Sequence, residues 1–375
     1  MKNLKFLAMF FAAALSLVAC ESGGESTELN GELVLKATPS IILCDGEQAS
    51  VLEATIGGKK VTNGVLIFDS NNKQLNLPDM RFTTTKEGVY TLWASYGDKI
   101  SNEVTITAVD EMPAATEIPL DPNPNSTSFA RKVLLVQYTG TECGFCPFMV
   151  NNIKQMPATV SKHCILTAAH RFTSSDPAFL VGANLEQTMA VAGFPTLAVD
   201  MHSLENDYRY PALIRTMVQN AIDREDAKAG IAACAAYSEE SRMVSVKAEI
   251  KAAVTDNYRI GAWLLEDGIY GKQANNGASG YDYNTHDNCI RIADSKVTGT
   301  DFTGHYLGEI KAGEKKVFEF NPTNMVLDKS WKAENCRLVI FITTEGEPSK
   351  YTTNTWYVNN VVVCPLNGSV AYQYK

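Results

Sequence analysis

Residues 141–148 of this 375-residue chain are Thr-Glu-Cys-Gly-Phe-Cys-Pro-Phe, so two cysteines with two residues between them stand in front of a proline. The preceding Val133-Leu134-Leu135-Val136 is typical of a strand buried on both faces. Helical sequence follows from Phe148 to Met156. A CxxC pair between a buried strand and a helix has three interpretations: a working redox pair, half of a metal site, or an inert staple.

The redox interpretation gives each cysteine a separate task. The free amides at a helix start stabilise a thiolate, which makes Cys143 the predicted nucleophile. Cys146 lies one turn further in and is predicted to resolve the mixed disulfide. This chemistry requires that solvent and a visiting chain reach Cys143 at the tip of the helix. If packed side chains covered it, only the function of a tethered scaffold would remain.

A second segment supports a particular fold around the pair. Residues 193–196 are Gly-Phe-Pro-Thr and open a later apolar run. Together with the strand, the CxxC and the helix, this segment resembles the thioredoxin fold. The resemblance implies that Pro195 follows a cis peptide bond and lies against the disulfide. Pro195 therefore joins Cys143 and Cys146 in the predicted catalytic site.

The sequence departs from the thioredoxin pattern at two positions. The buried acid that relays protons aligns on Gln137, and the aromatic residue before the first cysteine is replaced by Glu142, whose charge disfavours a neighbouring thiolate. A metal would need two further ligands from His163, Cys164 and His170, but the first two point to opposite faces of a strand. No metal and no cofactor are predicted, while the redox and inert interpretations both stay open.

The amino terminus is a targeting segment. Residues 1–19 carry two lysines and an apolar run too short to span a membrane, and they end before Cys20. Leu17-Val18-Ala19-Cys20 resembles the bacterial lipobox, which implies acylation of Cys20 and a membrane anchor without a transmembrane helix. Residues 20–30 form a polar, flexible tether. The sequence predicts an outer-membrane lipoprotein that faces the periplasm or the cell surface.

The net charge argues against one class of partner, and the cysteine count raises the question of disulfide pairing. Without residues 1–19 the chain has 31 basic and 42 acidic residues, a formal charge of about −11, which argues against nucleic acid as a partner. Cys44 is predicted to be a buried, unpaired thiol. Spacing alone does not pair the other cysteines, which are Cys164, Cys234, Cys289, Cys336 and Cys364.

The remaining chain is long enough for several domains. Helices are predicted at about 177–191 and 212–224 from apolar periodicity. The predicted order is an immunoglobulin-like β-sandwich at 31–110, a proline-rich linker at 111–128, an α/β thioredoxin-like domain at 129–228 and an antiparallel β-sandwich at 229–375.

A segment without regular patterning, residues 269–288, lies between two predicted strands of the last domain. Glu266 and Asp267 precede it, His286 lies near its end, and Arg291 follows it. These four side chains are candidates for binding a ligand or cation. The favoured alternative is a hydrogen-bonded network that only pins the loop.

The same region carries a second resemblance, to the twenty-eight-kilodalton outer-membrane-protein family of Gram-negative lipoproteins. It covers about 131–375 and implies a thioredoxin-like core with an appended β domain. Two functions stay open: thiol–disulfide exchange on a thiol-containing extracytoplasmic protein, and non-enzymatic binding or adhesion to a surface ligand. The residues that carry the resemblance are Thr139-Gly140, Cys143-x-x-Cys146-Pro147, Leu264-Leu265-Glu266-Asp267-Gly268-Ile269, Gln273, Tyr283, His286 and Arg291.

Overall fold

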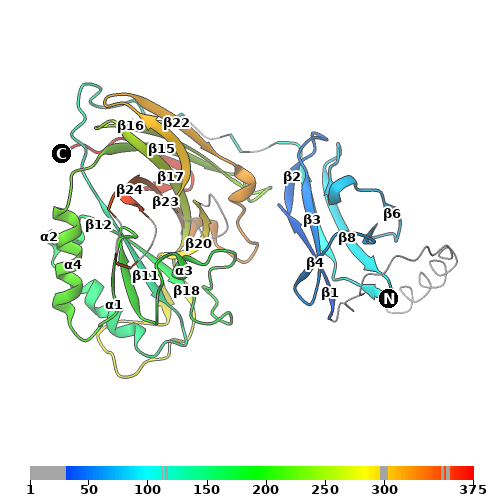
Figure 1. Cartoon of the computed structure of the whole chain (residues 1–375), viewed down its shortest axis with the longest axis horizontal. Helices are drawn as coiled ribbons and strands as arrows, with labels where there is room; N and C mark the ends of the chain where they lie inside the picture. The colour runs from blue at the N-terminus through cyan, green and yellow to red at the C-terminus, as the bar shows by residue number, and fades with distance from the viewer. Residues whose placement is uncertain (1–30, 112, 115–116, 296–302, 348–349, 352–354) are drawn as a thin grey trace. The chain divides into compact units, whose positions relative to one another are not determined.

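The computed structural model describes residues 31–111, 113–114, 117–295, 303–347, 350–351 and 355–375 (Figure 1). The predicted signal segment, Cys20 and tether lie outside these residues. The chain divides into two compact units, Met1–Met112 and Pro113–Lys375, each with more than one β-sheet. The prediction of a multidomain chain rich in β-sheet is confirmed. Within the described ranges, no helix has both the length and the apolar character that crossing a membrane requires.

The first unit consists of two sheets around one core. Its strands are β1 (Leu33–Thr38), β2 (Ile41–Leu43), β3 (Ser50–Ile56), β4 (Lys59–Val61), β5 (Leu66–Asp69), β6 (Gln74–Leu75), β7 (Arg81–Phe82), β8 (Gly88–Tyr96), β9 (Lys99–Ile100) and β10 (Val104–Val109). One sheet has the order β1-β3-β4 with β7 beside β3, and the other β2-β10-β8-β5-β6 with β9 beside β8. Because apolar side chains alternate along β1 and β3, one face of their sheet is buried in the core.

The second unit begins with an α/β segment. Its elements are β11 (Val133–Thr139), α1 (Cys146–Lys154), α2 (Ala158–Ser161), β12 (Cys164–His170), α3 (Leu185–Thr188), β13 (Thr196–Val199), β14 (Ser203–Glu205) and α4 (Pro211–Asp223). β11 is buried along its whole length, as predicted, and pairs in parallel with β12 and antiparallel with β13. α1 and α4 pack their apolar stripes against β11 and β13, where Ile153, Val218 and Leu135 share one core.

The rest of the unit is built from strands. They are β15 (Ala229–Tyr237), β16 (Val244–Ala252), β17 (Asp256–Glu266), β18 (Ile269–Tyr270), β19 (Thr285–His286), β20 (Cys289–Asp294), β21 (His305–Ile310), β22 (Lys315–Phe320), β23 (Cys336–Glu345), β24 (Trp356–Pro365) and β25 (Gly368–Val370). β22-β16-β15-β25 form one sheet, which packs against β17 and β23 through a common apolar core. The predicted antiparallel strands of this region are therefore present.

The helix predicted at about 177–191 is wrong, because only α3 is helical there. Arg171 Nη1 donates to Leu180 O at 2.6 Å, so that carbonyl is bonded to a side chain instead of a helical amide. Gly182 has φ of 78°, which is left-handed backbone and interrupts a right-handed helix. Apolar periodicity was present, but these local interactions oppose the helix.

The sequence predicts a domain boundary at 228/229, whereas the structure joins both sides in one sheet. The strand order is β14-β13-β11-β12-β20-β17-β23-β24, with β21 beside β17. The junction is the parallel pair Ala168↔Cys289 between β12 and β20. Tyr138 from the first segment shares a buried core with Trp263 and Phe341 from the second. A shared sheet and core make residues 113–375 a single unit.

The predicted linker also differs in the structure. Its carboxy-terminal part packs on the second unit instead of acting as a free spacer. Asp121 forms a buried ion pair with Lys251 at 2.9 Å and accepts a hydrogen bond from Tyr374 at 2.6 Å. Phe129 bridges to Tyr374 and is buried. Proline content alone did not indicate these long-range contacts.

A buried carboxylate fixes the start of β11. Asp200 Oδ2 pairs with Arg131 at 2.6 Å and with Arg224 at 3.2 Å, while Oδ1 accepts the Leu134 amide at 2.9 Å. Removing one member of a buried charge cluster leaves the others unpaired, which costs more free energy than the loss of an exposed pair.

We expect Asp200→Ala to lower the free energy of unfolding of residues 113–375 by about 3–5 kcal/mol, because Arg131 would remain buried without its partner. Asp207→Ala removes an exposed pair with Arg209 and is the matched control, with a much smaller expected loss because solvent screens this pair. Urea unfolding followed by hydrogen exchange of peptides from this unit measures both. Equal losses would contradict the role of Asp200.

Candidate functional site

The two cysteines of the CxxC form a disulfide. Cys143 lies in the turn after β11, Cys146 is the first residue of α1, and Pro147 occupies the first helical turn as predicted. Only 3% of Cys143 and 1% of Cys146 is exposed. Because each sulfur is bonded to the other, neither is a thiolate in this state, and both are covered.

A loop from the β domain covers the pair. We call residues 271–284 the covering loop and residues 140–146 the CxxC turn. Gln273 Nε2 lies 3.1 Å from Gly140 O, 3.1 Å from Thr141 O, 2.9 Å from Cys143 O and 3.0 Å from Ala274 O. One side-chain amide therefore lies within hydrogen-bond distance of the Cys143 carbonyl and of two carbonyls that precede Cys143 in the chain.

Backbone groups of the covering loop add to this contact. Ala274 N donates to Thr141 O at 2.7 Å, and Asn276 N donates to Gly144 O at 2.9 Å. A Cβ built on Gly144 would lie 2.7 Å from the Asn276 side-chain amide, so the small residue between the cysteines permits this close approach.

The far end of the covering loop is fastened to α1. Asn151 Nδ2 donates to Ser279 O at 3.1 Å, and Tyr283 Oη donates to Asn151 Oδ1 at 2.7 Å. The covering loop is thus hydrogen-bonded to both the CxxC turn and the helix that follows it. The expectation that solvent and a visiting chain reach Cys143 is wrong for this closed structure, because the loop occupies that face.

The peptide bond Phe194–Pro195 is cis, as the sequence predicts. Phe194 packs edge-to-face on Phe172, with ring centroids 5.5 Å apart. Phe172 in turn lies against Gly140, where an added Cβ would approach to 2.4 Å. These contacts connect the Pro195 segment to the start of the CxxC turn.

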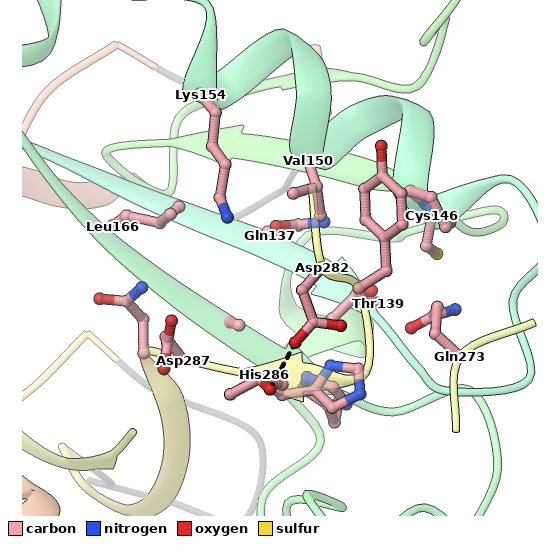
Figure 2. Close-up of a pocket in the computed structure, with 16 residues that line it drawn as sticks. Gln137, Thr139, Cys146, Val150, Lys154, Leu166, Gln273, Asp282, His286 and Asp287 are labelled. Atoms are coloured by element: carbon pink, nitrogen blue, oxygen red, sulfur yellow. Dashed lines mark hydrogen bonds between the residues drawn. The ribbon is translucent and has the colours of Figure 1, made fainter. Parts of the chain in front are cut away.

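A small cavity lies on the Cys146 side of the disulfide (Figure 2). Its volume is about 90 Å³, which is room for a few water molecules. Gln137, His170, Gln273 and His286 also line it, and Figure 2 shows the Gln273 and His286 side chains around it. The residue that replaces the usual buried acid, Gln137, therefore lines the same cavity as the second cysteine.

Two histidines at this cavity are held by defined partners. His170 Nδ1 lies 2.8 Å from Asp176 Oδ2, which also accepts the Thr141 amide at 2.7 Å. The rings of His170 and His286 meet edge-to-face with centroids 5.0 Å apart. Burial opposes ionisation of Asp176, but the hydrogen bond and charge of His170 lower its pKa to about 2.

His286 is poised to be neutral. Its Nε2 lies 3.0 Å from Gly271 O, and since a carbonyl only accepts, Nε2 carries the proton in the neutral ring. Burial, followed by the charge of His170, lowers the pKa of His286 below its ordinary value. Asp282, Asp287 and Lys154 are the other charged groups that line the cavity.

The four predicted ligand-binding residues do not form one open site. Glu266 pairs with Arg291 at 3.2 Å, both nearly buried. Asp267 pairs with Arg337 and accepts the amide of Asn288 at 2.6 Å. His286 is bonded to Gly271 at the base of the covering loop. These separate contacts favour the network interpretation, in which the side chains pin the loop.

The remaining cysteines are distributed over both units. Cys44, Cys164, Cys289, Cys336 and Cys364 are free thiols in the described part of the chain. Cys44 is unpaired as predicted but only half-buried. Burial raises the pKa of the Cys164, Cys336 and Cys364 thiols to about 12.

Sequence reasoning missed Asp176 and the structural role of Gln273. Asp176 stands in Ser-Ser-Asp-Pro, a segment without strand or helix periodicity, so only its turn-like composition marked it. Gln273 was one of the residues on which the family resemblance was based. Its contact with Cys143 was not predicted, because the two residues are 130 positions apart in the sequence. His170 was considered only as a metal ligand.

The fold and site together define a mostly β, multidomain protein with an oxidised and covered CxxC pair. Residues 183–363 match the model of the family outer membrane protein Omp28, which confirms the resemblance to this family for that part of the chain. The match includes the covering loop and begins after the CxxC turn, so it is shorter than the 131–375 expected from the sequence.

The chain is also similar to individual proteins, and these similarities are weaker than the family match. HBP35 of Porphyromonas gingivalis is similar over 64% of this chain and 77% of its own, at 18% identity and a TM-score of 0.47. Domains 4–9 of surface layer protein SbsC are similar over 92% of this chain and 51% of their own, at 8% identity and a TM-score of 0.16. No curated protein matches the chain.

We expect the second unit to lose stability as the pH falls below about 6.5, the ordinary histidine value. The folded pKa of His286 is lowered, so the unfolded chain takes up the proton first and acid favours unfolding. His286→Gln removes this contribution and should lose less stability between pH 7 and pH 5. Urea unfolding at both values measures the difference.

Burial also lowers the pKa values of His163 and His202, so they contribute to the loss that remains in His286→Gln. Burial raises the pKa of Asp200 to about 6, which acts in the opposite direction in both proteins. An identical loss in the native protein and in His286→Gln would contradict the assignment to His286.

Proposed function

We propose that this protein is a lipid-anchored outer-membrane protein that binds a surface ligand without catalysis. The lipobox-like segment before Cys20 and the family match at residues 183–363 support the location. The β-rich units are suited to act as stalk and display elements. Export determines whether the two units face the periplasm or the medium. The covered CxxC carries no information on this point.

The covered disulfide is the observation that carries this proposal. Thiol–disulfide exchange with a protein requires a sulfur that an incoming thiolate can approach in line with the S–S bond. Only 3% of Cys143 is exposed, and the Gln273 side chain donates a hydrogen bond to its backbone carbonyl. In the closed structure the disulfide therefore stiffens the junction between β11 and α1.

A thioredoxin-like core serves as the scaffold in this proposal. The strand order β14-β13-β11-β12, the parallel β11–β12 pair and the packing of α1 and α4 on one face support such a core. A fold does not by itself specify an activity. Gln137 in place of the acid and Glu142 beside Cys143 agree with a scaffold that does not turn over.

The second candidate function is thiol–disulfide exchange on an extracytoplasmic protein thiol. Two observations favour it: Cys146 is the first residue of α1, and the Phe194–Pro195 peptide bond is cis. Exchange would require the covering loop to leave the CxxC turn. The two candidates therefore differ in whether the loop opens to a protein substrate under native conditions.

We expect no insulin reduction by the protein with a dithiol as electron source, and a reduction potential below that of thioredoxin, about −270 mV. Cys146→Ala leaves Cys143 free to hold a mixed disulfide, so capture from envelope extracts tests for partners, with Cys143→Ala as the control. The proposal expects no Cys143-dependent adduct. Turnover, or a partner bound through Cys143, would instead establish the oxidoreductase.

A further inference from the structure

The covering loop makes hydrogen bonds to the CxxC turn, both within and just before the segment that the disulfide closes. The backbone amides of Ala274 and Asn276 and the side chain of Gln273 face carbonyls of this turn. We propose that closure of the covering loop and formation of the Cys143–Cys146 disulfide are linked, so that reduction of the disulfide releases the loop. This goes beyond the non-enzymatic function, since it needs a reductant but no protein substrate.

The first physical reason is space. Cys143 is buried beneath the covering loop and, unlike Cys146, does not line the cavity, so its surroundings are closely packed. Reduction replaces one covalent bond by two non-bonded thiols with hydrogens, which need more room. The closed loop is therefore complementary to the oxidised pair, and the reduced pair favours a structure in which the loop has moved.

The second reason is charge. A thiolate on Cys143 beneath the closed loop would lie in a dehydrated site, because the residue is only 3% exposed. In the open state water would solvate the same thiolate. Ionisation after reduction thus adds to the preference for the open loop, and the added preference grows as the pH rises.

Gln273 is the positioning residue of this switch. Its Nε2 has two hydrogens, and three carbonyls of the CxxC turn lie within 3.1 Å of it. A carboxylate of the same shape would place an oxygen against those carbonyls, where it only repels. Gln273→Glu therefore opens the covering loop without a change in side-chain size.

The chemical step balances with a dithiol as reductant. One of its thiolates attacks a cysteine sulfur, the Cys143–Cys146 bond breaks, and the other cysteine leaves as a thiolate. The second thiolate of the reductant then attacks the mixed disulfide and closes the reductant's own disulfide. Two electrons pass to the protein, and the two cysteine sulfurs take up protons according to their pKa values.

Opening would uncover the cavity beside Cys146. His170 and His286 line it, and His286 is held by Gly271 at the start of the covering loop. The redox state of the envelope would therefore decide whether this polar, histidine-bearing face is exposed. By linkage, whatever stabilises the open loop makes the disulfide easier to reduce by the same factor.

Hydrogen exchange of peptides from residues 271–284 tests the proposal in the full chain, oxidised and after equilibration with dithiothreitol. We expect exchange to be about tenfold faster after reduction. Cys143→Ser/Cys146→Ser, which has no disulfide, should exchange at the fast rate in the absence of reductant. Equal exchange in the oxidised, reduced and double-serine proteins would overturn the linkage.

Gln273→Glu tests the reverse direction. We expect fast exchange of the covering loop in its oxidised form and a roughly tenfold larger equilibrium constant for reduction, which is about 30 mV for a two-electron couple. Gln74→Glu, an exposed position in the first unit, is the matched control and should leave both unchanged. A loop that opens in Gln273→Glu with an unaltered reduction equilibrium would also overturn the proposal.

Discussion

The Gln273 amide connects two parts of the chain that are far apart in sequence. Its Nε2 group donates to carbonyls in the turn after β11, and the turn presents those carbonyls because the Cys143–Cys146 bond holds it closed. Backbone amides also donate to these carbonyls, so the Gln273 amide adds a further hydrogen-bond donor to a turn that is already bonded. The amide therefore fastens the covering loop to the CxxC turn, beside the cavity that Cys146 and His286 line.

Sequence patterning predicted the parts of this site that are local. Val133 to Val136 form part of β11, as their apolar run predicts. The cis bond before Pro195 was implied by the resemblance to the thioredoxin fold and is present. The apolar run depends on neighbours within a few residues, where composition carries information. The covering loop does not: residues 269–288 have no period, and their partners lie more than one hundred residues earlier. The sequence therefore predicted a long loop but not what it covers.

The same distinction explains why the sequence predicts a boundary at 228/229 where the structure has one continuous sheet. The change from α/β to alternating sequence near residue 229 is real, but a change in local pattern does not mean a separate core. β12 and β20 pair at one register position, and Tyr138 and Trp263 then share buried surface. Such a junction involves few residues and leaves no periodic signal. Contacts between the halves place the covering loop over the CxxC turn, so the site exists only because the two halves form one unit.

The free cysteines show why one disulfide is singled out. Cys289, Cys336 and Cys364 lie in strands of the central sheet, and burial raises their thiol pKa values, those of Cys336 and Cys364 to about 12. A thiolate is the species that attacks, so burial in these strands disfavours the reactive form of each thiol. Strand residues cover these three sulfurs, whereas a hydrogen-bonded loop covers the CxxC turn. A loop can open without global unfolding, which is why the proposed redox linkage concerns the CxxC pair and not the strand cysteines.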